Sequence, residues 1–100
     1  MSGLNERQKR HLRRLGHDRK PVVRTGNAGL TDAVIAELDV ALRDHELVKL
    51  KLVANDRQQR RRYTEELLAS TGAQLVQSIG HTILVYRPNP DKRNPIALPA

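Results

Sequence analysis

Residues 47–53 read LVKLKLV and constrain the fold more than any other segment of the chain. Lys49 and Lys51 alternate with the apolar side chains Val48, Leu50 and Leu52. Successive side chains of a β-strand point to opposite faces of its sheet, so this pattern predicts a strand with one buried and one wet face. Before it, Val34, Leu38, Ala41 and Leu42 recur at helical spacing. A helix therefore precedes this strand and packs on something apolar.

The same signals divide the whole chain into alternating elements. We expect helices at about residues 5–17, 31–45 and 55–71, and strands at 22–25, 47–53, 74–79 and 82–86. Asn5 and Thr31 are good helix N-caps, and Asn55 with Gln58 resembles a capping box that opens the third helix. Gly72 is the expected C-cap of that helix, and Gly80-His81 is the expected hairpin turn between the last two strands.

This αβαβαββ order predicts the fold class. Strands that are separated by helices pair in parallel, and a final hairpin adds an antiparallel strand. We therefore expect an α/β fold, a two-layer sandwich in which helices pack on a four-stranded mixed sheet. A single domain is expected over residues 1–88. Residues 89–100 are rich in proline, and we expect a loosely packed tail there.

Charge is distributed unevenly along the 100 residues, whose formal net charge is +7. The first twenty residues carry seven Lys or Arg and only two acidic residues, whereas residues 30–46 carry five acidic residues and one Arg. Four arginines follow within residues 57–62. A basic surface of this kind favours a polyanionic partner, most often a nucleic acid.

Several function classes find no support in the sequence. The chain has no Cys, and its four histidines are scattered without metal-ligand spacing. Phosphate-binding and nucleophile motifs such as G-x-x-x-x-G-K-[ST] and G-x-S-x-G are missing. We expect no catalysis, cofactor, metal or small-molecule substrate. The basic N-terminal segment has no apolar stretch behind it, and no apolar run is long enough to cross a bilayer, so we expect a cytoplasmic protein without membrane contact.

The loop Gly26-Asn27-Ala28-Gly29 between a strand and a helix is the sharpest candidate site. Two glycines let a phosphate–sugar backbone approach exposed N–H groups near a helix start, as in the GXXG loop of KH domains. The same pattern also suits a plain strand-to-helix turn, and Asp32 in the first helical turn would repel a phosphate. The attraction must come from nearby basic residues: Lys9, Arg10, Arg13, Arg14, Lys20 and Arg24. A bulky residue at Gly29 is then expected to weaken RNA binding and leave the fold largely intact.

Aromatic residues are scarce, which limits the mode of recognition. Only Tyr63 and Tyr86 are present, and both are expected to pack in the core rather than stack on bases. Readers of single strands stack bases on aromatic side chains. Contacts with the phosphates and the shape of a folded RNA therefore fit this chain better.

Four segments together resemble one known family. They are the helix with Leu12 and Leu15 that ends in Gly16-His17, the run 20–31 (KPVVRTGNAGLT), the segment 45–51 (HELVKLK) and the closing run 80–88 (GHTILVYRP). In this order and spacing they resemble the CRM domain family (chloroplast RNA splicing and ribosome maturation), whose single-domain bacterial members are the YhbY-like proteins. The resemblance covers about residues 4–98.

The resemblance implies an RNA-binding domain that is similar to the C-terminal domain of bacterial translation initiation factor three. It implies a role in assembly of the large ribosomal subunit, with rRNA of the subunit precursor as the partner. Ribosomal proteins are a further possible partner. The GXXG loop of the family maps onto Gly26, Asn27, Ala28 and Gly29. Many members carry a basic residue between the glycines, whereas this chain has Asn27 and Ala28, which raises the importance of Arg24 and the first helix.

Two alternatives remain open from the residues alone. The acidic second helix could dock on a ribosomal protein or an assembly enzyme, which would make the chain a protein-interaction module. Backbone contacts alone also fit a DNA-binding architectural protein, because they distinguish duplexes only weakly.

Overall fold

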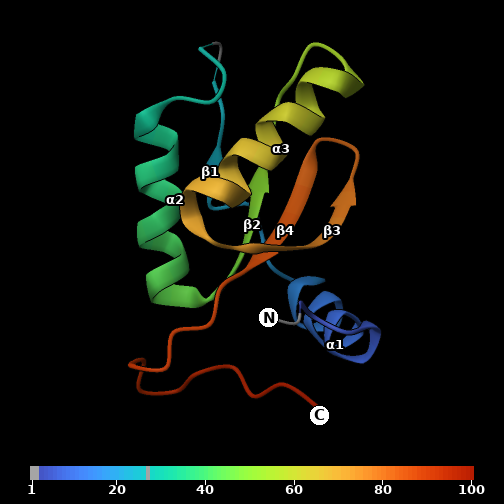
Figure 1. The fold of residues 1–100 in the computed structure, drawn as a ribbon, viewed down its shortest axis with the longest axis vertical. Helices are drawn as coiled ribbons and strands as arrows, with labels where there is room; N and C mark the ends of the chain where they lie inside the picture. Colours follow the sequence, from blue (N-terminus) through green and yellow to red (C-terminus); the bar gives the residue numbers. More distant parts are fainter. Residues whose placement is uncertain (1–2, 27) are drawn as a thin grey trace.

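The structure, a computed structural model, describes residues 3–26 and 28–100 (Figure 1). Its elements are α1 (Glu6–Gly16), β1 (Val23–Arg24), α2 (Asp32–His45), β2 (Leu47–Lys51), α3 (Arg57–Thr71), β3 (Gln74–Ile79) and β4 (Thr82–Tyr86). The strands form one sheet in the order β1-β2-β4-β3. β1 and β2 are parallel, and the other neighbouring pairs are antiparallel. The predicted αβαβαββ order and mixed sheet are confirmed.

Local capping explains where the helices begin. The Asn5 side chain accepts a hydrogen bond from Gln8 N at 2.8 Å, and Gln8 Oε1 accepts one from Asn5 N at 3.1 Å, which completes a capping box. Thr31 caps α2 as predicted. The predicted cap of α3 is wrong by one residue: Asp56 accepts from Gln59 N at 2.7 Å. A carboxylate at this position also interacts favourably with the positive end of the helix dipole.

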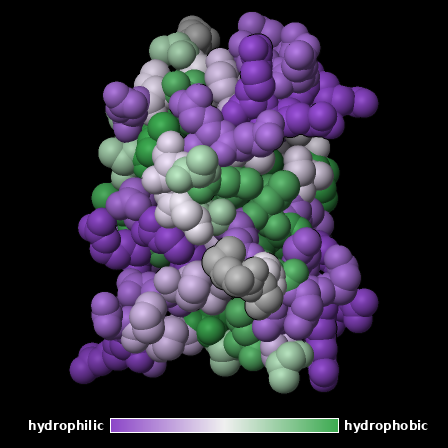
Figure 2. Space-filling model, viewed as in Figure 1, coloured by the Kyte–Doolittle hydropathy of each residue, from purple (hydrophilic) through white to green (hydrophobic). Residues whose placement is uncertain are grey.

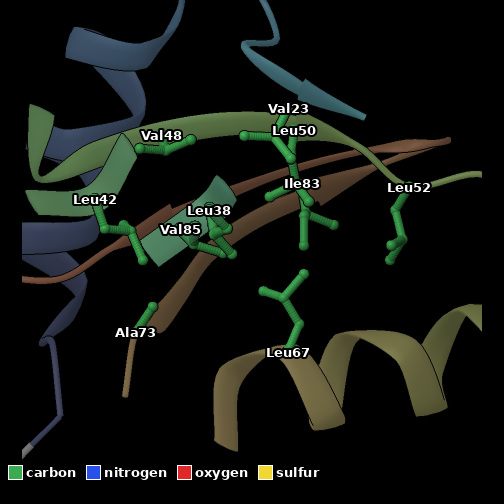
Figure 3. Packing of buried hydrophobic residues seen from close by; sticks show 10 residues of the cluster. All are labelled: Val23, Leu38, Leu42, Val48, Leu50, Leu52, Leu67, Ala73, Ile83 and Val85. Atoms are coloured by element: carbon green, nitrogen blue, oxygen red, sulfur yellow. The ribbon is translucent and has the colours of Figure 1, made fainter. Parts of the chain in front are cut away.

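The main core lies between the sheet and the helices α2 and α3 (Figure 3). Leu38 and Leu42 come from α2 and Leu67 from α3, and they meet the apolar sides of the strands. The strand residues in this core are Val23, Val48, Leu50, Ile83 and Val85. The strict alternation that predicted the buried face of β2 is confirmed at these positions.

The opposite face of the sheet carries a second, smaller core. Leu12 of α1 packs there against Leu47, Val76, Leu84 and Tyr86. α1 approaches closely because Gly16 has no side chain: a Cβ at this position would lie 2.7 Å from Leu84 Cδ2. The face that was predicted to be wet is therefore covered by α1 at one end and open at the other.

The C-terminal tail has no helix or strand, yet it is anchored to the domain. Glu46 is 1% exposed, and its carboxylate accepts hydrogen bonds from Asn89 N at 2.8 Å and Ile96 N at 2.7 Å. Ile96 and Leu98 pack against the smaller core. The proline content alone predicted a loosely packed tail. In the structure this tail contacts the domain at Asn89, Ile96 and Leu98.

Candidate nucleic-acid interface

The open end of the second sheet face is a row of polar and basic side chains. Arg24 pairs in register with Lys51, Lys51 with Thr82, and Thr82 with Ile79. Their neighbours Val23, Leu50 and Ile83 point into the main core, so this row points to the face on which α1 lies. The row contains two cations and, at its far end, an exposed apolar side chain.

Two adjoining grooves lie on this face. One, of about 650 Å³, runs between α1 and the sheet and is lined by Arg10, Arg13, Arg14, His17, Asp18, Lys49, Gln77 and Ile79. The other, of about 350 Å³, is lined by Arg19, Lys20, Pro21, Lys49, Gln77, Ile79, Thr82 and Leu84. Lys49 lines both grooves and therefore joins the arginines of α1 to Lys20. We call Arg10, Arg13, Arg14, Lys20, Arg24, Lys49 and Lys51 the basic sheet face.

Few acidic groups neutralise the basic sheet face. Among the described residues, Asp18 lines the larger groove, and Glu6 lies 4.0 Å from Arg13 at an exposed position. An exposed ion pair at that distance is weak, so Glu6 neutralises Arg13 only slightly. The acidic helix α2 packs on the opposite face of the sheet through Leu38 and Leu42. The sheet thus separates the acidic helix α2 from the basic sheet face.

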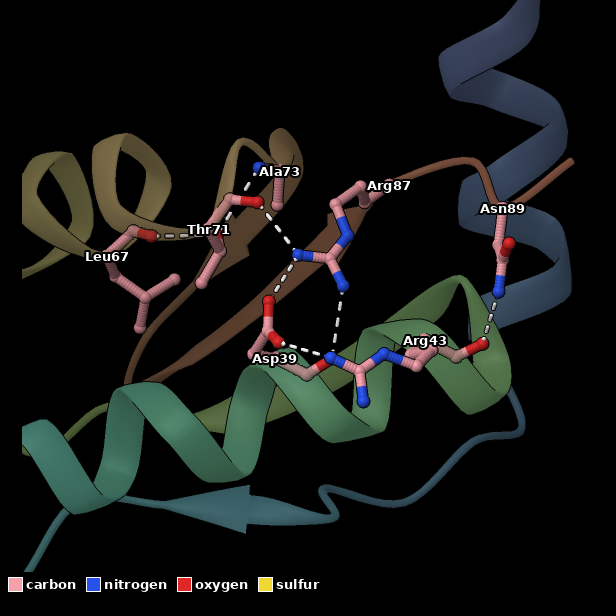
Figure 4. A network of polar contacts seen from close by, with 7 residues as sticks. All are labelled: Asp39, Arg43, Leu67, Thr71, Ala73, Arg87 and Asn89. Carbon is pink, nitrogen blue, oxygen red and sulfur yellow. Dashed lines mark hydrogen bonds and ion pairs between the residues drawn. The ribbon is translucent and has the colours of Figure 1, made fainter. Parts of the chain in front are cut away.

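On the α2 side, Asp39 is held by arginines (Figure 4). Arg87 Nη1 lies 2.6 Å from Asp39 Oδ1 and donates to Thr71 O at 2.9 Å, and Arg43 lies 3.0 Å from Asp39 Oδ2. The hydrogen bond from Arg87 and the charges of both arginines lower the pKa of Asp39, against a smaller opposing effect of burial. Asp39 therefore ties α2 to the end of β4.

The GXXG loop is closed by its own backbone. Gly29 N donates to Gly26 O at 3.0 Å, and the two glycines form an isolated β-bridge. Ala28 is exposed, whereas Asn27 lies outside the described residues. Thr25 is buried beneath the loop, where its hydroxyl accepts a hydrogen bond from Val53 N at 2.8 Å. The loop is thus fastened to the segment that follows β2.

The two glycines of the loop have different roles. Gly29 has a φ of +75°, and a Cβ on it would collide with the Tyr63 hydroxyl of α3 and lie 3.1 Å from Tyr63 Cζ. A Cβ on Gly26 would meet nothing within 4 Å. The expectation that a bulky residue at Gly29 leaves the fold intact needs correction, because this glycine is required by the backbone and by packing. Only Gly26 offers a clean test of close approach to a ligand.

The structure does not bring all the predicted site residues together. Figure 1 shows the loop at the upper end of the long axis and α1 in the lower half, so the basic helix does not meet the loop. The sheet face lies between them, and Arg24 at the end of β1 leads into Gly26. Lys9 is half-buried and is not among the residues that line either groove.

Sequence reasoning missed Lys49 and Lys51 as site residues. The signal was present, because the alternation of residues 47–53 placed both lysines on the wet face. The register that sets Lys51 beside Arg24 was not predictable from one strand alone. Arg19 lines the smaller groove too, but its guanidinium donates to Leu47 O at 2.7 Å and holds the α1–β1 connection on the sheet.

Neither tyrosine offers an exposed stacking platform. Tyr86 is 3% exposed in the smaller core, and burial raises its pKa, with a further contribution from the Glu46 charge. Tyr63 packs against the main core. The core positions predicted for both residues are confirmed. Recognition on this surface must therefore rest on charge, shape and hydrogen bonds.

Across residues 3–26 and 28–100, no group of three or more acidic or His side chains is placed to hold a metal ion. None of the helices in the same part of the chain is long and apolar enough to cross a membrane.

Comparisons with known proteins agree with one another. The model of the CRS1/YhbY (CRM) domain family matches residues 4–87. A probable RNA-binding protein of Pseudomonas aeruginosa is 48% identical over 87 residues, which cover 87% of this chain and 84% of that protein. An RNA-binding protein of Haemophilus influenzae is 39% identical over 93% of this chain and 94% of its own length.

A solved structure has the same fold. The solution structure of a hypothetical protein from Staphylococcus aureus, described as a candidate RNA-binding protein, superposes with a TM-score of 0.82 at 33% identity. The match covers 97% of this chain and all of that one. Because the family model spans most of the chain and the relatives match over nearly their whole length, this chain belongs to the CRS1/YhbY (CRM) domain family.

Proposed function

We propose that this protein binds RNA, and that the basic sheet face is the surface it uses. The observation that carries the proposal is the row formed by Arg24 and Lys51 beside Lys49, which connects the arginines of α1 to the start of the GXXG loop. Cations spaced along a face neutralise successive phosphates and release counterions. The relatives that are named RNA-binding proteins support the same partner.

A folded RNA suits this surface better than an extended strand. The side chains on the face supply charge, hydroxyl and amide groups, with Ile79 as an exposed apolar contact. Such groups recognise the phosphates, the 2′-hydroxyls and the shape of an RNA helix. The resemblance of the sequence to ribosome-maturation proteins supports rRNA in precursors of the large ribosomal subunit as the target. In this proposal the protein assists assembly in the cytoplasm without catalysing a reaction.

The test is the salt dependence of binding to a folded rRNA fragment. The variant Lys49→Gln/Lys51→Gln removes two charges from the sheet face, and Arg62→Gln/Arg93→Gln removes two exposed charges that line neither groove. Each lost phosphate contact reduces the slope of log K against log salt by roughly 0.7–0.9. We expect a slope reduced by roughly 1.5 for the lysine variant and nearly unchanged for the control. Equal slopes would contradict the assignment.

The same assay separates RNA from the alternatives. Duplex DNA of equal length, added as a competitor at fixed salt, should displace the folded RNA only weakly if the 2′-hydroxyls are read. Equal competition would favour an architectural DNA-binding protein. Co-sedimentation with ribosome precursors that survives nuclease treatment would favour a protein-interaction module.

A further inference from the structure

Another groove lies on the opposite side of the sheet from the basic sheet face. It has a volume of about 580 Å³ and runs between α3 and β3. Its lining comprises Arg57, Arg60, Arg61, Thr64, Glu65, Leu68, Leu75 and Ser78. We call it the α3 groove. In Figure 2 the hydrophilic surface at the start of α3 borders on a hydrophobic area over the neighbouring strands.

Strand β3 separates the α3 groove from the basic sheet face. Leu75 and Ser78 line the α3 groove, whereas Gln77 and Ile79 line the grooves of the basic sheet face. This division follows from the pleat, because successive side chains of a strand point to opposite faces. A register shift between Leu75 and Gln77 adjusts the alternation. The two surfaces therefore use different side chains of the same strand.

The α3 groove combines a cationic rim with an apolar floor. Arg57 and Arg61 are exposed and have no ion-pair partner within the described part of the chain, while Glu65 is the one acidic residue in the lining. Arg60 donates to Gly80 O, which fixes the helix to the β3–β4 turn. Guanidinium groups bind phosphates in a bidentate manner and also stack on bases.

Leu68 and Leu75 are half-buried and pack against the main core, so the floor of the groove is continuous with that core. No aromatic side chain of the residues that the structure describes lines this groove, so the arginines of the rim must supply the stacking that aromatic residues give in other readers of single strands. The apolar floor offers a further contact to the flat face of a base, which only an unpaired base presents. The volume lies within the range of sites that hold small ligands and therefore admits a nucleotide.

We propose that the α3 groove is a second RNA site, which takes a single-stranded segment, so that one molecule holds two RNA segments at once. The proposal rests on RNA being the partner of this protein and extends it to a bivalent mode of binding. In this arrangement the basic sheet face binds a folded element, and the arginines of α3 bind the phosphates of an unpaired strand nearby. Holding both segments would bring distant parts of an RNA together.

The test uses a fluorescent uridine oligonucleotide of about ten nucleotides, within the usual site size of single-strand binders. Its binding is measured by anisotropy with and without a saturating, unlabelled folded rRNA hairpin. We expect the oligonucleotide to bind in both conditions. Displacement of the oligonucleotide by the hairpin would overturn the proposal, because it would mean that the two RNAs share one surface.

Neighbouring arginines of α3 supply a matched pair of variants. Arg61 lines the groove and Arg62 does not, although both are exposed on the same helix. Loss of one charge-assisted contact should weaken oligonucleotide binding about tenfold or more in Arg61→Glu. Arg62→Glu should have a much smaller effect. Equal losses in the two variants would show that only the general field of the helix matters and would refute the groove.

Two further results separate this proposal from the function on which it rests. In Arg57→Glu/Arg61→Glu, hairpin affinity should stay within a few-fold of the original while oligonucleotide binding is lost; thermal unfolding checks that this variant is folded. A protein that binds the oligonucleotide but not the hairpin would contradict the proposed function of the sheet face and leave the groove standing. A polyglutamate peptide that displaces the oligonucleotide at equal charge concentration would instead assign the groove to an acidic protein.

Discussion

Replacing Gly29 by Ala should destabilise the protein through a contact with Tyr63. Gly29 has a φ of +75°, and this left-handed backbone costs a non-glycine residue about 1–2 kcal/mol. The new Cβ would also collide with the Tyr63 hydroxyl, and overpacking of this kind costs about 1–3 kcal/mol. We therefore expect a total loss of about 2–5 kcal/mol, which is a large part of the stability of a small domain.

The assay is urea unfolding of four proteins that form a double-mutant cycle: the original chain, Gly29→Ala, Tyr63→Phe and the double variant. Tyr63→Phe removes the atom that the new Cβ would strike first, although Cζ would still lie 3.1 Å away. The cost of Gly29→Ala should therefore fall by about 1 kcal/mol in the Tyr63→Phe background, within the range measured for contacting residues. The remainder combines the cost of the backbone conformation with the residual contact to the aromatic ring.

Gly26→Ala is the control, because a Cβ there has no neighbour within 4 Å. Its stability should change by no more than about 0.5 kcal/mol. If Gly29→Ala costs the same in the original chain and in the Tyr63→Phe background, the contact with the hydroxyl is refuted. A large cost of Gly26→Ala would refute the distinction between the two glycines.

Two further predictions concern the acidic residues. The Glu46 carboxylate anchors the tail through hydrogen bonds from Asn89 N and Ile96 N. Glu46→Ala should therefore lower the free energy of unfolding by about 1–3 kcal/mol and speed amide exchange at Asn89 and Ile96. Glu46 also has a φ of 63°. Glu46→Gly should be more stable than Glu46→Ala by about 1 kcal/mol in urea unfolding, since glycine adopts this φ without strain. Asp39 has a lowered pKa, so its contribution to stability is present above the ordinary value of 3.8 and is lost as the pH falls through the folded-state pKa. When the pH is lowered from neutral to acid, the urea midpoint should fall more for the original chain than for Asp39→Asn. Equal falls would contradict the stabilising role of the Asp39 carboxylate.

The fold was largely predictable because each element carried its own local signal. The alternation of residues 47–53, the caps Asn5 and Thr31, and Gly72 fixed most of the elements to within a residue or two. The third helix shows the limit of local signals, since Asn55 and Asp56 are both good caps and only the folded chain shows that Asp56 is used.

The candidate site was predictable in part. The sequence identified the basic residues but placed α1 beside the GXXG loop, because the two segments are close along the chain. Their separation depends on how Leu12 and Gly16 dock on the far face of the sheet, which is a tertiary contact between distant residues. The role of Tyr63 behind Gly29 is of the same kind. Neither has a signal in the local pattern.

The most direct test of the proposed interface is an amide-resolved NMR titration with a folded rRNA fragment at moderate salt. The proposal predicts that signals of Arg24, Lys49 and Lys51 shift or broaden first, together with those of α1 residues that line the larger groove. Signals from the exposed acidic side of α2, such as that of Glu37, should stay in place. Shifts that concentrate on α2 while Lys49 and Lys51 remain unchanged would contradict the assignment of RNA binding to the basic sheet face.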